Sequence, residues 1–500
     1  MNKLLTLAAV GVTLSAQTRT TMFPPVRGTR EMVGAANNFE VEAGFRMLTQ
    51  GGNAIDAGVA SVLAAAVTEQ ARFGIGGEIP ILIKMSGKPA VAISGVGVAP
   101  GKATVEFYRN RKPEPWEEPG HMPPIPSQGI LATTLPGVFD GLILALSQFG
   151  SMSFAQVAAP AIEYAEGFPI GEEFAAFIRN SQKILELWPA SRSFFLPGGA
   201  PPARGDIFRE PTLAKTLREL VATEKKARGK RAAKLKAVRD LFYQGSLAKR
   251  MAAFSESNGG LISYDDLKNF HAETDTPRTT TYRGYEVLKP GFWTQGPVML
   301  EMLNLLEGYD LKAMGHNSPE FLHTVVEAAK LGFADRDRYY GDPKFSTIPE
   351  QTLLLTPGHP NQLQPGKRPR VTLSPTIVLK DGQPFLALST PGGDNQDQAL
   401  LQVLLNIIDF GMSPQEAVEA PRFQSEHFYA SFANHEFVPG KLNLESRIPK
   451  ATADRLGAMG HRVSVTGEWS NSSAPTVIQI SNGTLQGGAD PRRSRFIFGR

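Results

Sequence analysis

Two β-hairpin signals in the last quarter of the chain constrain its fold more than any other feature. Residues 376–380 and 385–388 flank Asp381-Gly382, and residues 476–480 and 484–486 flank Asn482-Gly483. Asp-Gly and Asn-Gly are the preferred two-residue turns between antiparallel strands. The apolar run 79–83, a turn at Ser86-Gly87 and the run 91–93 predict a third hairpin near the other end. Strands at both ends with helices between them predict antiparallel sheets assembled from distant sequence and covered by helices.

Helical patterns fill most of the region between the hairpins. Asn37 or Asn38 can cap a first helix, and Gly51-Gly52 is suited to ending it. A second helix follows from Asn53, with small residues that allow another element to approach closely. Further helices are expected at 154–165, 212–223, 235–242, 297–306, 318–338 and 397–408, with one strand at 285–288. The run Gly74-Ile75-Gly76-Gly77 lacks the spacing of a phosphate-binding loop and leads into a strand, so it predicts close backbone packing.

Composition excludes several classes of protein. The chain has 500 residues, 42% of them apolar and 20% charged, which is ordinary for a globular protein and unlike a disordered one. Cysteine is absent, so disulfides, zinc–thiolate sites and a cysteine nucleophile are excluded.

A basic run between Lys225 and Arg239 accounts for much of the net charge of +4. Such a run can bind nucleic acid. However, no base-stacking aromatic residues interleave it, and alanine and leucine lie between the charges. We therefore interpret it as a solvated helix face and expect no nucleic-acid partner.

The N-terminus resembles a signal peptide. Lys3 is followed by an apolar stretch from Leu4 to Val12, which continues through Ala16 into polar Gln17. The stretch is shorter than the roughly 20 apolar residues that span a bilayer. We expect residues 1–16 to direct export to the periplasm or outside the cell, with no membrane span; the alternative is an ordinary N-terminal helix or strand. An exported protein without disulfides suits a bacterial periplasm.

A series of motifs resembles the γ-glutamyltransferase family in order along nearly the whole chain. They include Gly51-Gly52-Asn53, Phe333-Ala334-Asp335, Lys367-Arg368-Pro369, Pro391-Gly392-Gly393 and Ala420-Pro421-Arg422-Phe423. Each motif alone is weak, but the ordered set is specific.

The resemblance implies an α+β fold, the αββα sandwich of N-terminal-nucleophile hydrolases. In that family a precursor cuts itself before a threonine, whose hydroxyl then attacks and whose α-amine acts as base. The threonine takes the γ-glutamyl group of glutathione or a related amide and passes it to water or an amino acid. No cofactor is expected for this chemistry. The oligomeric state stays open.

The family pattern divides this chain into three regions after the signal peptide. Residues 17–343 match the large subunit, residues 367–500 match the small subunit, and residues 344–366 form a shortened junction. Family members carry the nucleophile on a strand within a much longer insertion at that junction. The Asp-Thr-Thr-His-like motif and the following hairpin are not found here, so the nucleophile is unknown and the central sheet is expected to be incomplete. Thr352 and Thr356 are poor replacements, because Thr356 precedes a proline and neither heads a useful strand.

Site residues are assigned by resemblance. The backbone N–H groups of Gly392 and Gly393 would form the oxyanion hole; the alternative is a simple turn before a helix. Thr372 would occupy a substrate-binding position, where the family has two adjacent serines and this chain has Val371 and Thr372. Thr372 as the nucleophile itself is a weaker alternative. The arginine that holds the substrate α-carboxylate in the best-known members should fall within 95–100, where this chain has none.

Two other polar features have structural interpretations. We interpret residues 335–338, Asp-Arg-Asp-Arg, as an ion-pair network at a helix end. His359 is interpreted as a loop residue, because no second ligand stands at metal-binding spacing.

The sequence leaves two alternative hypotheses for the function of this protein. The first is γ-glutamyl transfer or hydrolysis, by a displaced nucleophile or by a native protein that retains the omitted segment. The second is a noncatalytic relative, a binding protein or a deletion product, that keeps the scaffold.

Overall fold

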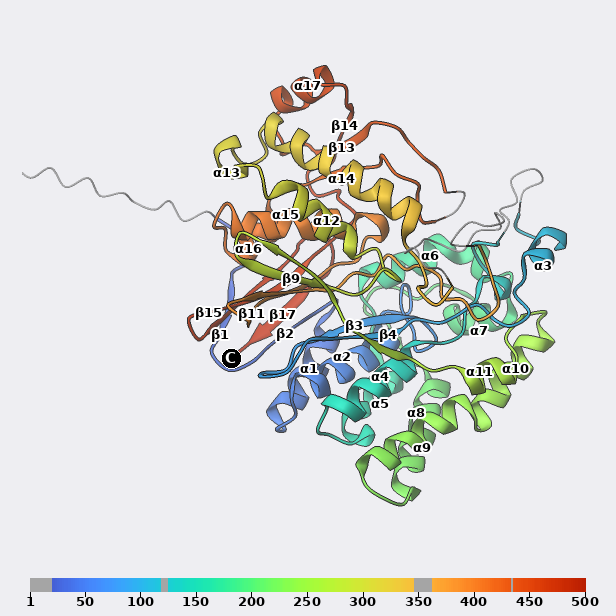
Figure 1. Cartoon of the computed structure of the whole chain (residues 1–500). Coiled ribbons are helices and arrows are strands. Elements are labelled where there is room, and N and C mark those ends of the chain that lie inside the picture. Colours follow the sequence, from blue (N-terminus) through green and yellow to red (C-terminus); the bar gives the residue numbers. More distant parts are fainter. Residues whose placement is uncertain (1–19, 118–124, 346–361, 433–434) are drawn as a thin grey trace, which may run out of the picture.

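The computed structural model describes residues 20–117, 125–345, 362–432 and 435–500. The signal-peptide prediction, Thr352, Thr356 and His359 lie outside these residues. Two layers of strands are enclosed by two layers of helices, which confirms the predicted αββα sandwich (Figure 1). Within the described part, no helix combines the length and apolar character needed to cross a membrane.

The first strand layer is a fully antiparallel sheet that combines both ends of the chain. Its order is β1 (Val26–Gly28), β16 (Thr484–Ala489), β15 (Thr476–Ser481), β11 (Gln383–Ser389), β10 (Thr376–Lys380), β9 (Tyr285–Lys289) and β8 (Arg278–Tyr282). Both predicted C-terminal hairpins are present, and their turn residues Asp381, Gly382, Asn482 and Gly483 all have the positive φ that such turns require.

The second strand layer consists of two separate pieces among the described residues. One pairs β17 (Phe496–Gly499) with β2 (Met32–Ala35), and the other has the order β3 (Ile79–Ile83), β4 (Val91–Gly95) and β7 (Glu273–Asp275). Glycines allow the β17–β2 piece to approach the large sheet: a Cβ on Gly34 would lie 2.4 Å from Thr476, and one on Gly487 would lie 2.5 Å from Ile497.

One helical layer covers the outer face of the large sheet and shares an apolar core with it. It contains α12 (Pro297–Leu306), α14 (Pro319–Tyr339), α15 (Gln396–Ile408) and α16 (Pro414–Glu419), with α13 (Leu311–Met314) and α17 (Lys450–Ala458) further out. A small sheet of β12 (Phe423–Ser425), β13 (Lys441–Glu445) and β14 (Arg462–Thr466) accompanies this layer, and its β13–β14 pair is parallel.

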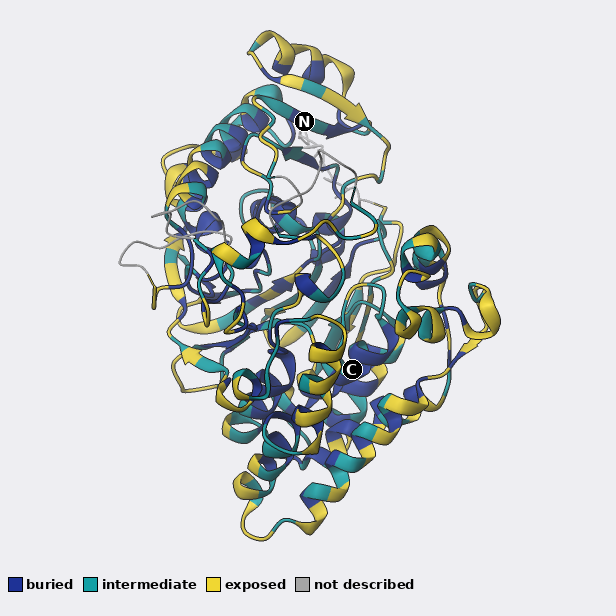
Figure 2. Cartoon of the chain, turned by 90° about the vertical axis from the view of Figure 1, so that its right-hand side faces the viewer, coloured by how far each residue is buried: buried dark blue, intermediate teal, exposed yellow. Residues whose placement is uncertain are grey.

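The other helical layer covers the second strand layer and contains the second large core. Its main helices are α1 (Asn38–Thr49), α2 (Ala54–Thr68), α4 (Val138–Phe149), α5 (Phe154–Glu166), α8 (Pro211–Lys226) and α9 (Arg231–Tyr243). Peripheral elements are α3 (Val105–Asn110), α6 (Glu172–Leu185), α7 (Pro189–Phe195), α10 (Ser246–Ser257), α11 (Tyr264–Asn269), β5 (Phe168–Pro169) and β6 (Ile207–Phe208). Figure 2 shows buried residues concentrated within the layers and exposed residues on their outer surfaces.

The helix caps form as expected. The Asn37 side chain accepts the Glu40 N–H at the start of α1. Asn53 and Asp56 form a capping box at the start of α2.

The interpretation of the basic run as one solvated helix face was wrong in part. The run spans the end of α8, a turn and most of α9. Most of its charges are exposed, but Arg239 is buried and its Nε lies 2.6 Å from Oδ1 of Asp140. Arg231 donates to the carbonyls of Leu146, Ser147 and Met152. Guanidinium groups satisfy buried acceptors well, so these two residues join helices.

Candidate active site

The Gly392–Gly393 turn connects β11 to α15 through a short 3₁₀ helix, residues Gly393–Asn395. Gly392 has φ +132° and Gly393 has φ +58°, values that disfavour residues with a side chain. A Cβ on Gly392 would lie 2.2 Å from Oγ of Ser473, and one on Gly393 would lie 2.7 Å from the ring of Phe432. Glycine is therefore required at Gly392 by both conformation and space.

The backbone N–H groups of Gly392 and Gly393 donate to no acceptor in the described part of the chain. Both residues are only partly buried, and Gly392 borders a cavity of about 230 Å³ whose lining also includes Asp394 and Phe432. Two adjacent unpaired N–H groups at a tight turn can bind a carbonyl oxygen that becomes negative during acyl transfer.

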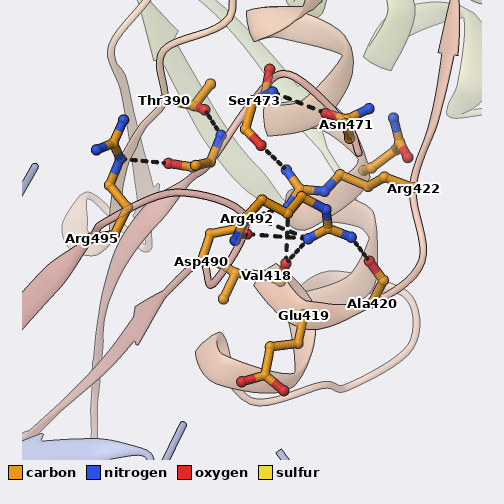
Figure 3. Close-up of polar contacts among 12 residues, drawn as sticks. Thr390, Val418, Glu419, Ala420, Arg422, Asn471, Ser473, Asp490, Arg492 and Arg495 are labelled. Carbon is orange, nitrogen blue, oxygen red and sulfur yellow. Dashed lines mark hydrogen bonds and ion pairs between the residues drawn. The ribbon is translucent and has the colours of Figure 1, made fainter. Parts of the chain in front are cut away.

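Polar side chains of the 471–474 segment contact the end of the turn, and Figure 3 shows Asn471 and Ser473 near Thr390, which precedes it. The Asn395 amide donates to Oδ1 of Asn471 at 2.8 Å and to Oγ of Ser473 at 3.0 Å. Thr390, just before the turn, accepts the Ala474 N–H at 2.9 Å. These contacts fix the turn against the loop before β15 and restrict its movement.

Beneath this loop lies a buried network of charges. Arg492 bonds Glu445 at 2.6 Å, and Arg422 pairs with Asp490. Arg492 also donates to the carbonyls of Val418 and Ala420 (Figure 3). Burial and the neighbouring Arg492 lower the pKa of Arg422. Paired charges of this kind hold their segments in one arrangement.

Asp394 occupies the centre of a second network on the other side of the turn. It pairs with Arg336 and accepts the Ser431 N–H at 2.8 Å, while Arg370 donates to the Ser431 hydroxyl at 2.6 Å. Burial opposes ionisation of Asp394, but Arg336 and Arg370 outweigh it and hold the pKa of this carboxyl below its usual range. The predicted ion-pair network at the end of α14 is confirmed for Arg336, which bonds Asp337 as well as Asp394.

Gln295 links this network to the turn. Its side chain accepts from Arg336 and donates to the Gly393 carbonyl, both at 3.2 Å. A buried ion pair lies nearby: Nζ of Lys289 is 2.7 Å from Oδ1 of Asp397, and both side chains are fully buried. Burial raises the pKa of Asp397 and lowers the pKa of Lys289. The sequence contained no local signal for Gln295 or for this ion pair, because Arg336 and Gly393 lie 41 and 98 residues from Gln295, and Asp397 is likewise distant in the sequence from Lys289.

Thr372 is buried beside the turn. With its amide oriented to donate, Gln396 bridges the carbonyls of Thr372 at 3.3 Å and Thr390 at 3.0 Å. The backbone of Thr372 is therefore linked through Gln396 to Thr390, which lies just before the turn.

The position expected to hold a substrate carboxylate is apolar. Val96 and Val371 share a buried cluster with Ala92 and Trp293. Val96 lies within residues 95–100, where the resemblance predicts an arginine, and Val371 occupies a position where it predicts a serine. Neither valine side chain can bind a carboxylate.

The segments that flank the predicted junction 344–366 are hydrogen-bonded to each other. The Arg368 N–H donates to Oδ2 of Asp342 at 2.9 Å. Gly366 and Lys367 pair with Ala99 at 2.9 and 2.8 Å, so the region after the junction adjoins the 95–100 segment. Residues 346–361 lie outside the described residues.

Among the described residues, a gap near α2 separates the two pieces of the second strand layer. On one side, Ser61 donates to the Glu40 carbonyl of α1, and α1 packs against β2 and β17. On the other side, Ile55 joins an apolar cluster with residues of β3 and β4. Between these sides Gly58 is exposed, and a Cβ on it would meet nothing within 4 Å, while Val62 and Ala65 are only partly buried. A small apolar helix face is thus left uncovered where a continuous sheet would cover it.

Sequence comparisons with known proteins agree on one protein family. A family model described as γ-glutamyltranspeptidase matches residues 41–357 and 350–499. The glutathione hydrolase-like YwrD proenzyme of Bacillus subtilis is 29% identical, with 93% of this chain and 98% of the relative covered. The glutathione hydrolase proenzyme of Escherichia coli is 28% identical (94% and 92%), and an acylase ACY 1 proenzyme of Pseudomonas is 31% identical (88% and 88%).

Solved structures agree on the fold. Cephalosporin acylase from Bacillus halodurans has a TM-score of 0.84 over 98% of this chain and 99% of its own, at 24% identity. A γ-glutamyltranspeptidase from Helicobacter pylori has a TM-score of 0.57 at 28% identity, covering 67% of this chain and 96% of its own. The fold, the ordered motifs and these relatives together show that the chain belongs to the γ-glutamyltranspeptidase family.

Proposed function

We propose that this protein acts on γ-glutamyl amides of the glutathione class and binds their γ-carbonyl oxygen at the Gly392–Gly393 turn. The observation that carries the proposal is the pair of N–H groups, without an acceptor among the described residues, in a turn that hydrogen bonds hold on both sides. The relatives named as glutathione hydrolases support the substrate class.

The reaction that such a site serves is γ-glutamyl transfer or hydrolysis through a threonine acyl-enzyme. The threonine hydroxyl would attack the γ-carbonyl, its α-amine would pass the proton to the leaving amine, and water or an amino acid would then resolve the ester. The two N–H groups would stabilise the oxyanion of each tetrahedral intermediate.

The hydroxyl groups nearest the turn are already engaged. Ser473 accepts from Asn395, Thr390 donates to the Pro391 carbonyl, and Ser431 donates to Asp394. None heads a chain with a free α-amine. Catalysis would therefore need a threonine freed by self-cleavage elsewhere, in the junction 344–366 or, as a weaker alternative, at Thr372.

A noncatalytic relative that binds γ-glutamyl compounds without turnover is the second candidate. The α2 face around Gly58, which no described strand covers, favours it, because a missing strand would leave such a gap. The alignment with the YwrD proenzyme has 544 positions but uses 93% of this 500-residue chain, so about 80 positions lack a counterpart here. The two family matches also meet at residues 350–357, within the shortened junction.

One experiment separates the two candidates. The purified protein is run on a denaturing gel, any smaller band is sequenced from its N-terminus, and release of nitroaniline from γ-glutamyl-4-nitroanilide is measured. Two chains and nitroaniline release that Gly392→Ala abolishes would support catalysis. One intact chain without release would exclude it and leave the binding function. We further propose that residues 1–16 direct export, which comparison of the N-termini of cell-associated and exported protein tests.

A further inference from the structure

Two histidines and a glutamate converge on the outer helical layer, away from the Gly392–Gly393 turn. His323 and Glu327 lie one helical turn apart on α14, and His461 lies between α17 and β14, which pack beside α14 (Figure 1). Nδ1 of His323 is 2.9 Å from Nε2 of His461, and these nitrogens lie 3.8 and 3.9 Å from Oε1 of Glu327. The three ligand atoms thus lie within 4.8 Å of one another.

We propose that His323, Glu327 and His461 form a binding site for a divalent transition metal of the zinc class. Two imidazole nitrogens and one carboxylate oxygen are a ligand set that zinc accepts, with a fourth position left for water. Nitrogen–metal bonds of about 2.0–2.1 Å in tetrahedral geometry place two ligating nitrogens roughly 3.3 Å apart, slightly more than the 2.9 Å between the two histidines here. Small side-chain adjustments would bring Glu327 within the same range.

Charge and exposure suit this role. Imidazole nitrogens bind metal in their neutral form, which offers a lone pair. His461 is almost fully buried, whereas His323 and Glu327 are partly exposed, so a metal ion can enter from solvent.

Lys330 is the competing cation. Its Nζ lies 2.6 Å from the same Oε1 atom of Glu327. A bound metal ion would compete with the Lys330 ammonium group for the Glu327 carboxylate. Removing the ammonium group should therefore strengthen metal binding, which is an effect that a simple hydrogen-bonding role for the histidines does not produce.

The site would act as a structural link. It joins the first half of α14 to the segment between α17 and β14, whereas Arg336, which contacts Asp394, lies 13 residues further along α14. At 1.5 Å per residue this separation is about 20 Å. Metal binding should then raise the thermal stability of the whole chain.

The test is calorimetric titration of the full chain, without a polyhistidine tag, with ZnCl₂ and in parallel with CoCl₂. One equivalent should bind, and Zn²⁺ should raise the Tm. His323→Ala and His461→Gln should weaken binding by roughly 100-fold, and Lys330→Met should tighten it. His271→Gln, at an exposed histidine in the other helical layer, is the matched control. Circular dichroism checks that each variant is folded.

The proposal is overturned if wild-type protein shows no saturable binding below millimolar metal. It is also overturned if folded His323→Ala and His461→Gln bind as wild type does, or if Lys330→Met does not change the affinity.

Discussion

Replacing Gly392 by alanine tests the geometry on which the site depends. The new Cβ would lie 2.2 Å from Oγ and 3.2 Å from Cα of Ser473, in a backbone conformation with φ +132°. The backbone term costs roughly 1–2 kcal/mol and the overpacking roughly 1–3 kcal/mol. Gly392→Ala should therefore lower the free energy of unfolding by about 2–5 kcal/mol.

Gly382→Ala is the matched control. Gly382 also has a positive φ, +73°, but a Cβ there meets nothing within 4 Å. This variant should show only the backbone cost, about 1–2 kcal/mol. Urea unfolding followed by tryptophan fluorescence measures both variants.

Ser473→Gly identifies the source of the difference. Relative to Ser473→Gly alone, the double variant Gly392→Ala/Ser473→Gly should lose less stability than Gly392→Ala loses in the wild-type background. Equal costs for Gly392→Ala and Gly382→Ala would refute the close packing of the turn against Ser473.

Three further predictions concern buried charges. Lys289→Met should cost about 3–5 kcal/mol because it leaves Asp397 buried without its cation, and Lys289→Met/Asp397→Leu should recover most of this loss in urea unfolding; equal costs would contradict the ion pair. Burial raises the pKa of Glu210 to about 8, so its contribution to stability is complete below its unfolded pKa and is lost as pH rises to about 8, at up to about 1.4 kcal/mol per pH unit. Glu210→Gln should flatten the fall of Tm between pH 5 and 8, and an unchanged slope would count against the buried carboxyl. Hydrogen bonds from Ser151, Met152 and Asn53 outweigh burial and lower the pKa of Asp56, so its contribution is present above its unfolded pKa and disappears as pH falls through the lowered value. Asp56→Asn should cost about 1–3 kcal/mol at pH 7 and much less at pH 3; a loss that does not depend on pH would contradict this.

Local signals predicted the elements that are specified locally. The Asp381-Gly382 and Asn482-Gly483 turns fix their hairpins because both residues adopt a positive φ, and the asparagine caps of α1 and α2 mark their helices. By contrast, β1, β2 and β17 have only three or four residues, and each pairs with a strand more than 400 residues away. Such strands are defined by their partners and have too little pattern of their own.

Site residues could be predicted from the sequence only where they belong to a family motif. Gly392, Gly393 and Thr372 came from resemblance, and Gln396 links the backbone of Thr372 to Thr390, just before the glycine turn. The supporting residues Gln295, Ser431 and Ser473 were missed, because hydroxyl and amide side chains occur throughout the chain and only the fold brings these three to the turn. Arg239 was assigned to solvent because the charges around it are exposed, whereas its partner Asp140 lies on another helix.

Calorimetric titration with glutathione tests most directly whether the Gly392–Gly393 turn holds a γ-glutamyl carbonyl. Both candidate functions require this binding, and a continuing heat signal would additionally report turnover. The account predicts one saturable site for glutathione, much weaker binding of cysteinylglycine, which lacks the γ-glutamyl group, and at least about tenfold weaker binding of glutathione to Gly392→Ala. Absence of glutathione binding, or equal affinity for cysteinylglycine, would contradict the account.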